Sequence, residues 1–312
     1  MNPHLDTLVT ALYVRIDDLL AQNPQWAPQR PAVGIKPKLS DAELVALAVV
    51  SALLGFDNES RFVRYAKAHL RPWFPYIPNR DGYNKRLRRC ADMIARVISR
   101  LARECPDWAD DVWLVDSTPV ECGRSPQTQR RSDLAGWAQY GWSASHSRFF
   151  WGLRLHLIAT PSGLPVAFAL AGAKADEREV CAEMIARAQI ARSAQTLIAD
   201  KGYRSKAFEQ QLNDAGITLL RPATRAEPQR PGARFLRPLR QIIESINNTL
   251  KAQLSPERHR GRTRAGVAVR ILTRILALTA AIWHNRTNHH QPARSLTAYD
   301  HQPLGTNHLG NP

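Results

Sequence analysis

The chain has 312 residues and a formal net charge of +16 at pH 7. Its hydrophobic content of 44% excludes global disorder and supplies enough apolar side chains for one large or two ordinary domains. The excess of Lys and Arg indicates a polyanionic partner, and the longest mostly apolar run, Leu44 to Phe56, is too short to span a bilayer. We therefore expect a nucleic acid partner and no membrane.

The first 105 residues are expected to form a helical, DNA-binding domain. Ser40 and Glu43 have the spacing of a capping box before an apolar run, and Gly55 can end that helix. A strongly basic helix is predicted from Tyr83 to Leu101. Two interpretations stay open for it: a DNA-binding headpiece, or a helical bundle with a solvated basic face. The candidate DNA-contacting residues are Lys85, Arg86, Arg88 and Arg89.

Residues 106–285 alternate between strand and helix patterns. Helices are expected from Asp176 to Arg192 and from Lys206 to Ala215. This order predicts an α/β fold with a mixed five-stranded sheet flanked by helices. The five strands are Val112 to Asp116, Phe149 to Thr160, Val166 to Leu170, Thr196 to Asp200 and Ile217 to Leu220.

Several basic stretches lie between and after these elements. The turn-rich segment Pro119 to Gly141 contains Arg124, Arg130 and Arg131, which either line a DNA path or only solubilise a loop; Trp137 and Trp142 either pack in the core or stack on an unpaired base. A basic loop is expected from Arg221 to Arg240, and a second basic cluster, Arg258 to Arg264, precedes a final packed helix. The polar residues 286–312 are expected to be a disordered tail.

The four cysteines, at positions 90, 105, 122 and 181, form no CxxC pair. We therefore expect free thiols in a reducing cytoplasm and no structural zinc site.

Three acidic residues stand apart from the other carboxylates. Asp116 and Asp200 each end an apolar strand, and strand ends in an open sheet converge on one crevice. Glu244 lies on a helix whose polar face also carries Arg240, Asn247 and Lys251. Taken singly, the aspartates suit turns or caps, and the glutamate suits surface ion pairs. Together, three carboxylates can hold two divalent ions roughly 3.5–4 Å apart for phosphodiester chemistry.

The surrounding residues resemble a known family. Val115-Asp116-Ser-Thr-Pro-Val, Ala199-Asp200-Lys-Gly-Tyr203, and the spaced series Arg240, Glu244 and Lys251 look like the three motif blocks of bacterial insertion-sequence transposases of the Asp-Asp-Glu class. Phe149 to His156 adds a resemblance to the family of insertion sequence nine-eight-two. One departure is Arg237, where related transposases often carry a tyrosine.

The resemblance implies a ribonuclease-H-like core, two Mg²⁺ ions (or Mn²⁺) held by Asp116, Asp200 and Glu244, and a homodimer on DNA. Arg240 and Lys251 become candidates for phosphate contacts, with Lys201 and Arg237 as further candidates. The expected activity is cleavage of element ends and their joining to target double-stranded DNA, in the bacterial cytoplasm at the nucleoid. A metal-dependent nuclease or resolvase, or a catalytically silent DNA-binding protein, is the alternative. No small-molecule substrate is expected.

Overall fold

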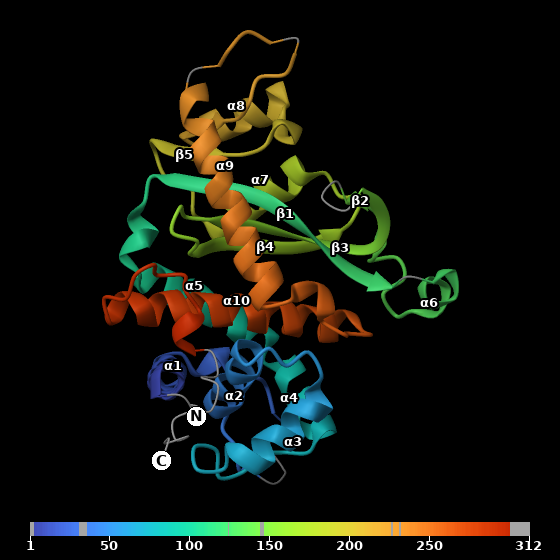
Figure 1. Ribbon diagram of the computed structural model, residues 1–312, viewed down its shortest axis with the longest axis vertical. Helices are drawn as coiled ribbons and strands as arrows, with labels where there is room; N and C mark the ends of the chain where they lie inside the picture. Colours follow the sequence, from blue (N-terminus) through green and yellow to red (C-terminus); the bar gives the residue numbers. More distant parts are fainter. Residues whose placement is uncertain are drawn as a thin grey trace, which may run out of the picture.

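The structure is a computed structural model that describes residues 3–30, 36–123, 125–143, 147–225, 227–230 and 232–299. For residues 233–235, 237, 239–240 and 251–252 it describes the backbone alone. A group of helices built mainly from the first hundred residues lies at one end of the molecule, and a sheet covered by helices lies at the other (Figure 1).

The helical region begins as the sequence predicts and then departs from it. Glu43 N donates a hydrogen bond to Ser40 Oγ over 3.0 Å, which completes the expected capping box. The single basic helix predicted from Tyr83 to Leu101 is wrong, because the chain breaks at the buried Cys90. There Cys90 N bonds to Leu87 O, three residues back, and ends the first helix. The five helices are α1 Pro3–Gln22, α2 Asp41–Leu53, α3 Glu59–His69, α4 Arg80–Arg89 and α5 Ala91–Glu104.

The sheet contains six strands where five were expected. They are β1 Val112–Gly123, β2 Gln139–Ser143, β3 Arg148–Ala159, β4 Pro165–Gly172, β5 Gln195–Ile198 and β6 Ile217–Leu220. The neighbouring strands run in the order β4, β3, β1, β5, β6; β2 adds to the edge of β3 alongside its first residues.

Strand directions divide the sheet into two parts. β3 is antiparallel to both β1 and β4, whereas β5 and β6 are parallel to β1. This mixed sheet flanked by helices, preceded by a helical region, is the predicted α/β class with a ribonuclease-H-like arrangement. The strand that the sequence missed, β2, lies in a turn-rich stretch whose glycine obscures the strand pattern.

Two helical layers cover the sheet. On one face α7 (Glu177–Ala188) and α8 (Lys206–Asp214) pack on a core that includes Trp113 and Val115. On the other face Leu114 belongs to the larger core that continues into α5 and α10. Side chains alternate between faces along a strand, so the even-numbered residues of β1 point to the second face. Asp116 continues that row.

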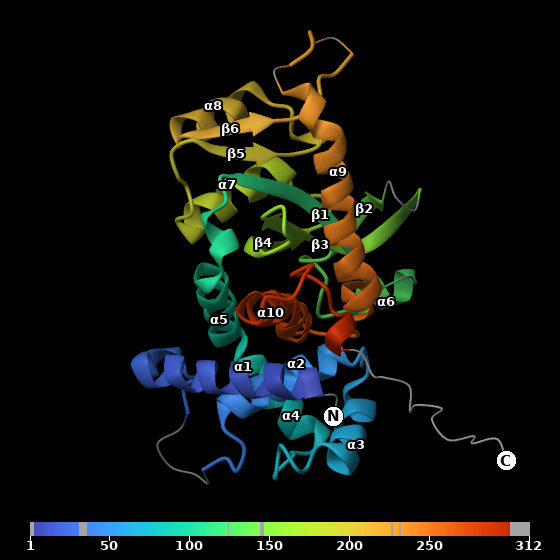
Figure 2. The same ribbon diagram turned by 60° about the vertical axis from the view of Figure 1, so that its left-hand side comes forward.

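The helix α10 (Arg264–Thr287) lies between the sheet and the helical region (Figure 2). It contacts α5, α2 and α1, so the helical region is completed by a segment from outside residues 1–105. By length and composition α10 could cross a membrane, but 78% of its most apolar stretch is buried inside the protein. These contacts make α10 a core helix of the protein, as the sequence predicted for its final packed helix.

The polar segment after α10 is folded as far as the structure describes it. Residues 286 and 287 belong to α10, and the chain then returns so that Tyr299 is buried against it. Tyr299 OH donates to Asn285 Oδ1 over 2.7 Å, and His284 Nδ1 lies 2.9 Å from the same hydroxyl. The expected disorder is therefore wrong for residues 286–299, because their polar groups make buried hydrogen bonds. Residues 300–312 lie outside the described residues.

Candidate active site

Strand register brings Asp116 and Asp200 to the same place. Leu114 of β1 lies opposite Ile198 of the parallel neighbour β5, and each aspartate comes two residues later. Both Leu114 and Ile198 belong to the core on the α10 side, so the two aspartates extend onto that face too. Adjacent strands lie roughly 4.8 Å apart. The two carboxylates are therefore neighbours just past the point where the parallel pairing of β1 and β5 stops. Asp116 lies inside β1, which continues to Gly123, so the prediction that this strand ends at Asp116 is wrong.

The environment of Asp116 is unusual for a carboxylate. Burial raises its pKa to about 6, and the charges of Asp200 and Glu177 act in the same direction. Two donors oppose this shift: Ser117 N, at 2.7 Å from Oδ1, and the side-chain amide of Asn247, which bonds to Oδ2. A partly buried carboxylate surrounded by like charges is a position where a cation would be stabilised.

The helix α9 (Ala233–Asn248) brings Asn247 to this site. It crosses in front of β1 in Figure 1 and lies beside the same strand in Figure 2, and the two elements are in contact. The Asn247 amide donates to Asp116 and accepts from Thr118 Oγ1 over 3.3 Å, so it bridges two residues of β1. The loop predicted to extend to Arg240 is shorter than expected, because α9 begins at Ala233 and includes Pro238.

Glu244 does not join the two aspartates. It lies on α9, three residues before Asn247, and is exposed. No three Asp, Glu, His or Cys side chains are gathered to hold a metal ion within the described part of the chain. The physical reason is an offset along the helix axis, since Asn247 occupies the turn that faces Asp116 and Glu244 lies three residues earlier, roughly 4.5 Å away along the axis. The resemblance predicts three gathered carboxylates, and the structure brings two together.

A second polar network lies on the other face of β1. Ser117 Oγ donates to Glu177 Oε1 over 2.6 Å, and Arg154 Nη1 lies 2.9 Å from Ser117 Oγ and 3.3 Å from Glu177 Oε1. Arg154 also donates to the carbonyl of Trp142 over 2.7 Å. The sequence placed Glu177 only in the first turn of the helix expected from Asp176. The available signal was Arg154, a charged residue within the apolar pattern of β3.

The cations predicted near the acidic residues are placed unevenly. Lys201 is exposed and directly follows Asp200 in a short 3₁₀ turn, Lys201–Tyr203. Arg237 and Arg240 lie on α9, and their side chains are outside the described atoms, as is that of Lys251. The backbone at Lys251 belongs to a π-helical turn, Thr249–Gln253, so the α-helical spacing behind the predicted shared face stops at Asn248.

The basic residues of α4 divide into two kinds. Lys85 and Arg89 are exposed, and Arg88 is partly exposed. Arg86 instead donates to Leu39 O over 2.7 Å and pairs with Asp41 Oδ1 over 2.9 Å, and that aspartate is only 9% exposed. The structure therefore gives Arg86 a role in holding the helical region together, and its role as a DNA contact stays a prediction.

The turn-rich segment after β1 is partly helical. Arg130 and Arg131 are exposed in α6 (Pro126–Arg131), whereas Arg124 lies outside the described residues. Trp137 packs against the main core, as the core interpretation predicts. Trp142 does not: it is 47% exposed and makes an edge contact with Phe149, which is 70% exposed.

Fold and site together define an α/β protein with neighbouring carboxylates just past the point where two adjacent strands stop their parallel pairing, crossed by a helix. The family model described as "Transposase DDE domain" matches residues 107–280, more than half of the chain. The chain therefore belongs to this family of transposase domains.

Comparison with solved structures and with curated proteins gives weaker information than the family model. The cryo-EM structure of a piggyBac transposase synaptic complex with hairpin DNA is similar over 72% of this chain, with 10% identity and a TM-score of 0.32. This chain spans 50% of the length of that transposase chain. No curated protein matches.

Proposed function

We propose that this protein is a DNA transposase that cleaves the ends of its own element and joins them to target DNA by phosphodiester hydrolysis and transesterification. The carrying observation is the neighbouring position of Asp116 and Asp200 on parallel strands, inside the region that matches the transposase family. Paired carboxylates at such an edge suit phosphoryl transfer, where charge at phosphorus must be neutralised.

The donor set fits hard divalent cations, Mg²⁺ in the first place and Mn²⁺ as its substitute. Asp116 and Asp200 offer adjacent carboxylate oxygens, and the pKa of Asp116 is raised first by burial and then by the charges of Asp200 and Glu177, which a cation would neutralise. When bound, two such ions supply charge neutralisation at the phosphate and at the attacking and leaving oxygens. The family resemblance assigns Glu244 as the third ligand, and its place on α9 three residues before Asn247 keeps it near Asp116 along the helix.

Glu177 is the structural alternative for the third ligand, and its contacts argue against it. Its carboxylate accepts from Ser117 and lies 3.3 Å from the Arg154 guanidinium, so its charge already has a partner. We assign Glu177 and Arg154 to holding Ser117, next to Asp116. Asn247 orients the Asp116 carboxylate by donating to one oxygen while Ser117 N donates to the other.

The remaining assignments concern DNA and assembly. Arg237, Arg240, Lys251 and Lys201 would contact phosphates of the element ends, because they lie on α9, just after it or beside Asp200. Double-stranded DNA ends and target are the proposed partners, held by a homodimer in the bacterial cytoplasm at the nucleoid. Within the family, we propose the group of insertion sequence nine-eight-two.

Supercoiled plasmid carrying the element ends tests the proposal directly. Wild-type protein should nick and join DNA only with Mg²⁺ or Mn²⁺, and Asp116→Asn, Asp200→Asn and Glu244→Gln should each abolish both steps while DNA binding persists. Glu177→Gln should retain measurable cleavage.

Each other outcome has a defined meaning for the proposal. Cuts without joined products would identify a nuclease or resolvase. Absence of cleavage with bound ends would indicate a catalytically silent DNA-binding protein. A Glu244→Gln protein that cleaves at the wild-type rate, beside an inactive Glu177→Gln protein, would move the third ligand to Glu177.

A further inference from the structure

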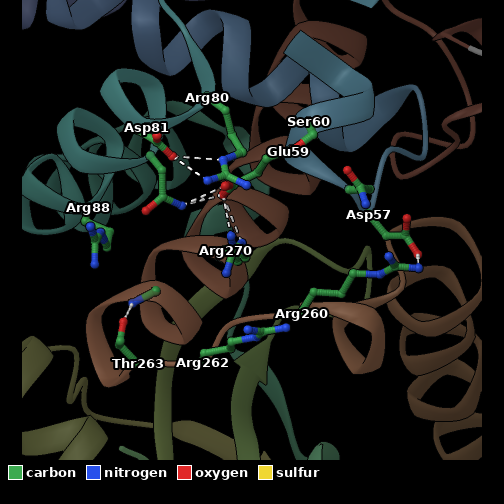
Figure 3. Close-up of a pocket in the computed structure, with 13 residues that line it drawn as sticks. Asp57, Glu59, Ser60, Arg80, Asp81, Arg88, Arg260, Arg262, Thr263 and Arg270 are labelled. Carbon is green, nitrogen blue, oxygen red and sulfur yellow. Dashed lines mark hydrogen bonds and ion pairs between the residues drawn. The ribbon is translucent and has the colours of Figure 1, made fainter. Parts of the chain in front are cut away.

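A basic hollow lies between the helical region and the start of α10 (Figure 3). It has a volume of about 440 Å³, and its walls come from α3, α4 and the segment that leads into α10. A second hollow of about 410 Å³ shares Asp57 and Arg260 with it and reaches Glu121 to Gly123 at the end of β1. We call the two hollows together the arginine groove. The basic cluster singled out in the sequence, Arg258 to Arg264, forms one of its sides.

Charges in the arginine groove are only partly paired. Two ion pairs within it are Arg270–Glu59, at 2.6 Å, and Arg260–Asp57, at 3.3 Å. Arg80 is likewise paired, with the neighbouring Asp81. Among the described residues, Arg88 on α4 and Arg262 before α10 form no ion pair or hydrogen bond. The acids of the first hollow are therefore neutralised by arginines, and the Arg88 and Arg262 guanidinium groups are left there for an external anion. The second hollow adds Arg258 and Glu257, whose side chains are in no ion pair among the described residues.

The Arg258 to Arg264 segment is held firmly against β1. His259 Nδ1 accepts from Gly261 N over 2.9 Å, so Nε2 carries the ring proton and donates to Glu121 O over 3.1 Å. Burial lowers the pKa of His259 to about 4, which keeps this neutral form at physiological pH. A Cβ at Gly261 would lie 2.8 Å from Val267, so the close approach requires glycine. Arginines on such a fixed segment lose little conformational freedom on binding.

We propose that the arginine groove binds the phosphodiester backbone of duplex DNA and leads it toward the acidic residues of β1. Planar guanidinium groups suit phosphate oxygens, and Arg88 and Arg262 present them from two different elements of the groove wall. The two hollows adjoin at Asp57 and Arg260, so the lining residues run from α4 to the end of β1, as a strand of backbone requires. Its β1 end, at Glu121, lies five residues beyond Asp116 on the same strand, roughly 17 Å. That is about half a helical turn of DNA.

This inference rests on the proposed function and is tested by binding alone. Fluorescence anisotropy with a labelled duplex of about 30 base pairs, in EDTA so that no cleavage occurs, gives the affinity at a series of KCl concentrations. Arg88→Gln and Arg262→Gln should each lower the slope of log K against log salt by about 1, and the double variant by about 2. Arg187→Gln is the matched control, because Arg187 is an exposed arginine on α7, on the opposite face of the sheet.

Several results would overturn the assignment. One is an unchanged slope in the double variant, with circular dichroism showing an intact fold. Another is a slope loss equal to that of Arg187→Gln. Displacement of DNA by inorganic phosphate at constant ionic strength would assign the groove to free phosphate instead. Failure of the transposase proposal looks different: the slope losses appear as expected, but no metal-dependent cleavage is found.

Discussion

Replacing Asp116 by asparagine should make the metal-free protein more stable while abolishing its activity. The pKa of Asp116 is raised from 3.8 to about 6, mainly by burial. A raised carboxylate pKa means that the folded state prefers the protonated form, so the destabilisation is absent below pH 3.8 and complete above about pH 6. Each pKa unit corresponds to 1.36 kcal/mol, so at pH 8 the ionised side chain costs at most about 3 kcal/mol of folding free energy.

Asparagine imitates the protonated acid, and the site can accommodate it. Ser117 N can still donate to the remaining oxygen. The new amide nitrogen can donate to Asn247 Oδ1 after that amide turns, and Asn247 Nδ2 can then donate to Thr118 Oγ1. We therefore expect Asp116→Asn to gain about 2 kcal/mol at pH 8 in EDTA, slightly less than the full electrostatic cost.

Urea unfolding followed by circular dichroism measures this gain, at pH 8 and pH 4, with and without Mn²⁺. The gain should vanish near pH 4, and Mn²⁺ should stabilise the wild type but not the variant. Asp133→Asn, at an exposed loop aspartate, is the matched control and should change nothing. An Asp116→Asn protein less stable than wild type at pH 8 in EDTA would refute the electrostatic reasoning.

Three further predictions follow from individual contacts. His156 is buried, and burial is the main cause that lowers its pKa to about 4. The neutral ring therefore contributes stability that is fully present above pH 6.5 and is lost as pH falls through 4. His156→Phe should remove roughly 3 kcal/mol of this loss, measured by urea unfolding at pH 7 and pH 4. Asn247→Ala removes a hydrogen bond to the Asp116 carboxylate worth about 1.5–3 kcal/mol, so Mn²⁺ binding by calorimetry should weaken at least tenfold, and unchanged binding would exclude the orienting role. Arg86→Ala should cost about 2 kcal/mol of stability, because the ion pair with Asp41 is lost. The salt slope of DNA binding should not change, whereas removing a residue that contacts phosphate would lower it.

Local sequence rules predicted what depends on one strand or one helix. Asp116 and Asp200 were found because each follows a short apolar run, although β1 continues beyond Asp116, and the equal register of β1 and β5 then makes them neighbours. The axial position of Glu244 relative to β1 depends on how α9 crosses the sheet, which periodicity does not encode. The sequence did not predict the break at Cys90 for a related reason. The residues on both sides have helical composition, and only packing ends α4 there. Glu177 was assigned to a helix start, correctly, and its contact with Ser117 comes from a strand sixty residues away.

The central position of α10 makes the protein's two ends interdependent. The N-terminal helices bury their apolar side chains against a helix that is synthesised after every strand of the sheet, from residue 264 onward. A fragment truncated before that point would expose the apolar surfaces of α2 and α5 to water and invite aggregation. A nascent chain therefore cannot complete either half of its architecture until α10 has left the ribosome, and the two halves mature together rather than one after the other.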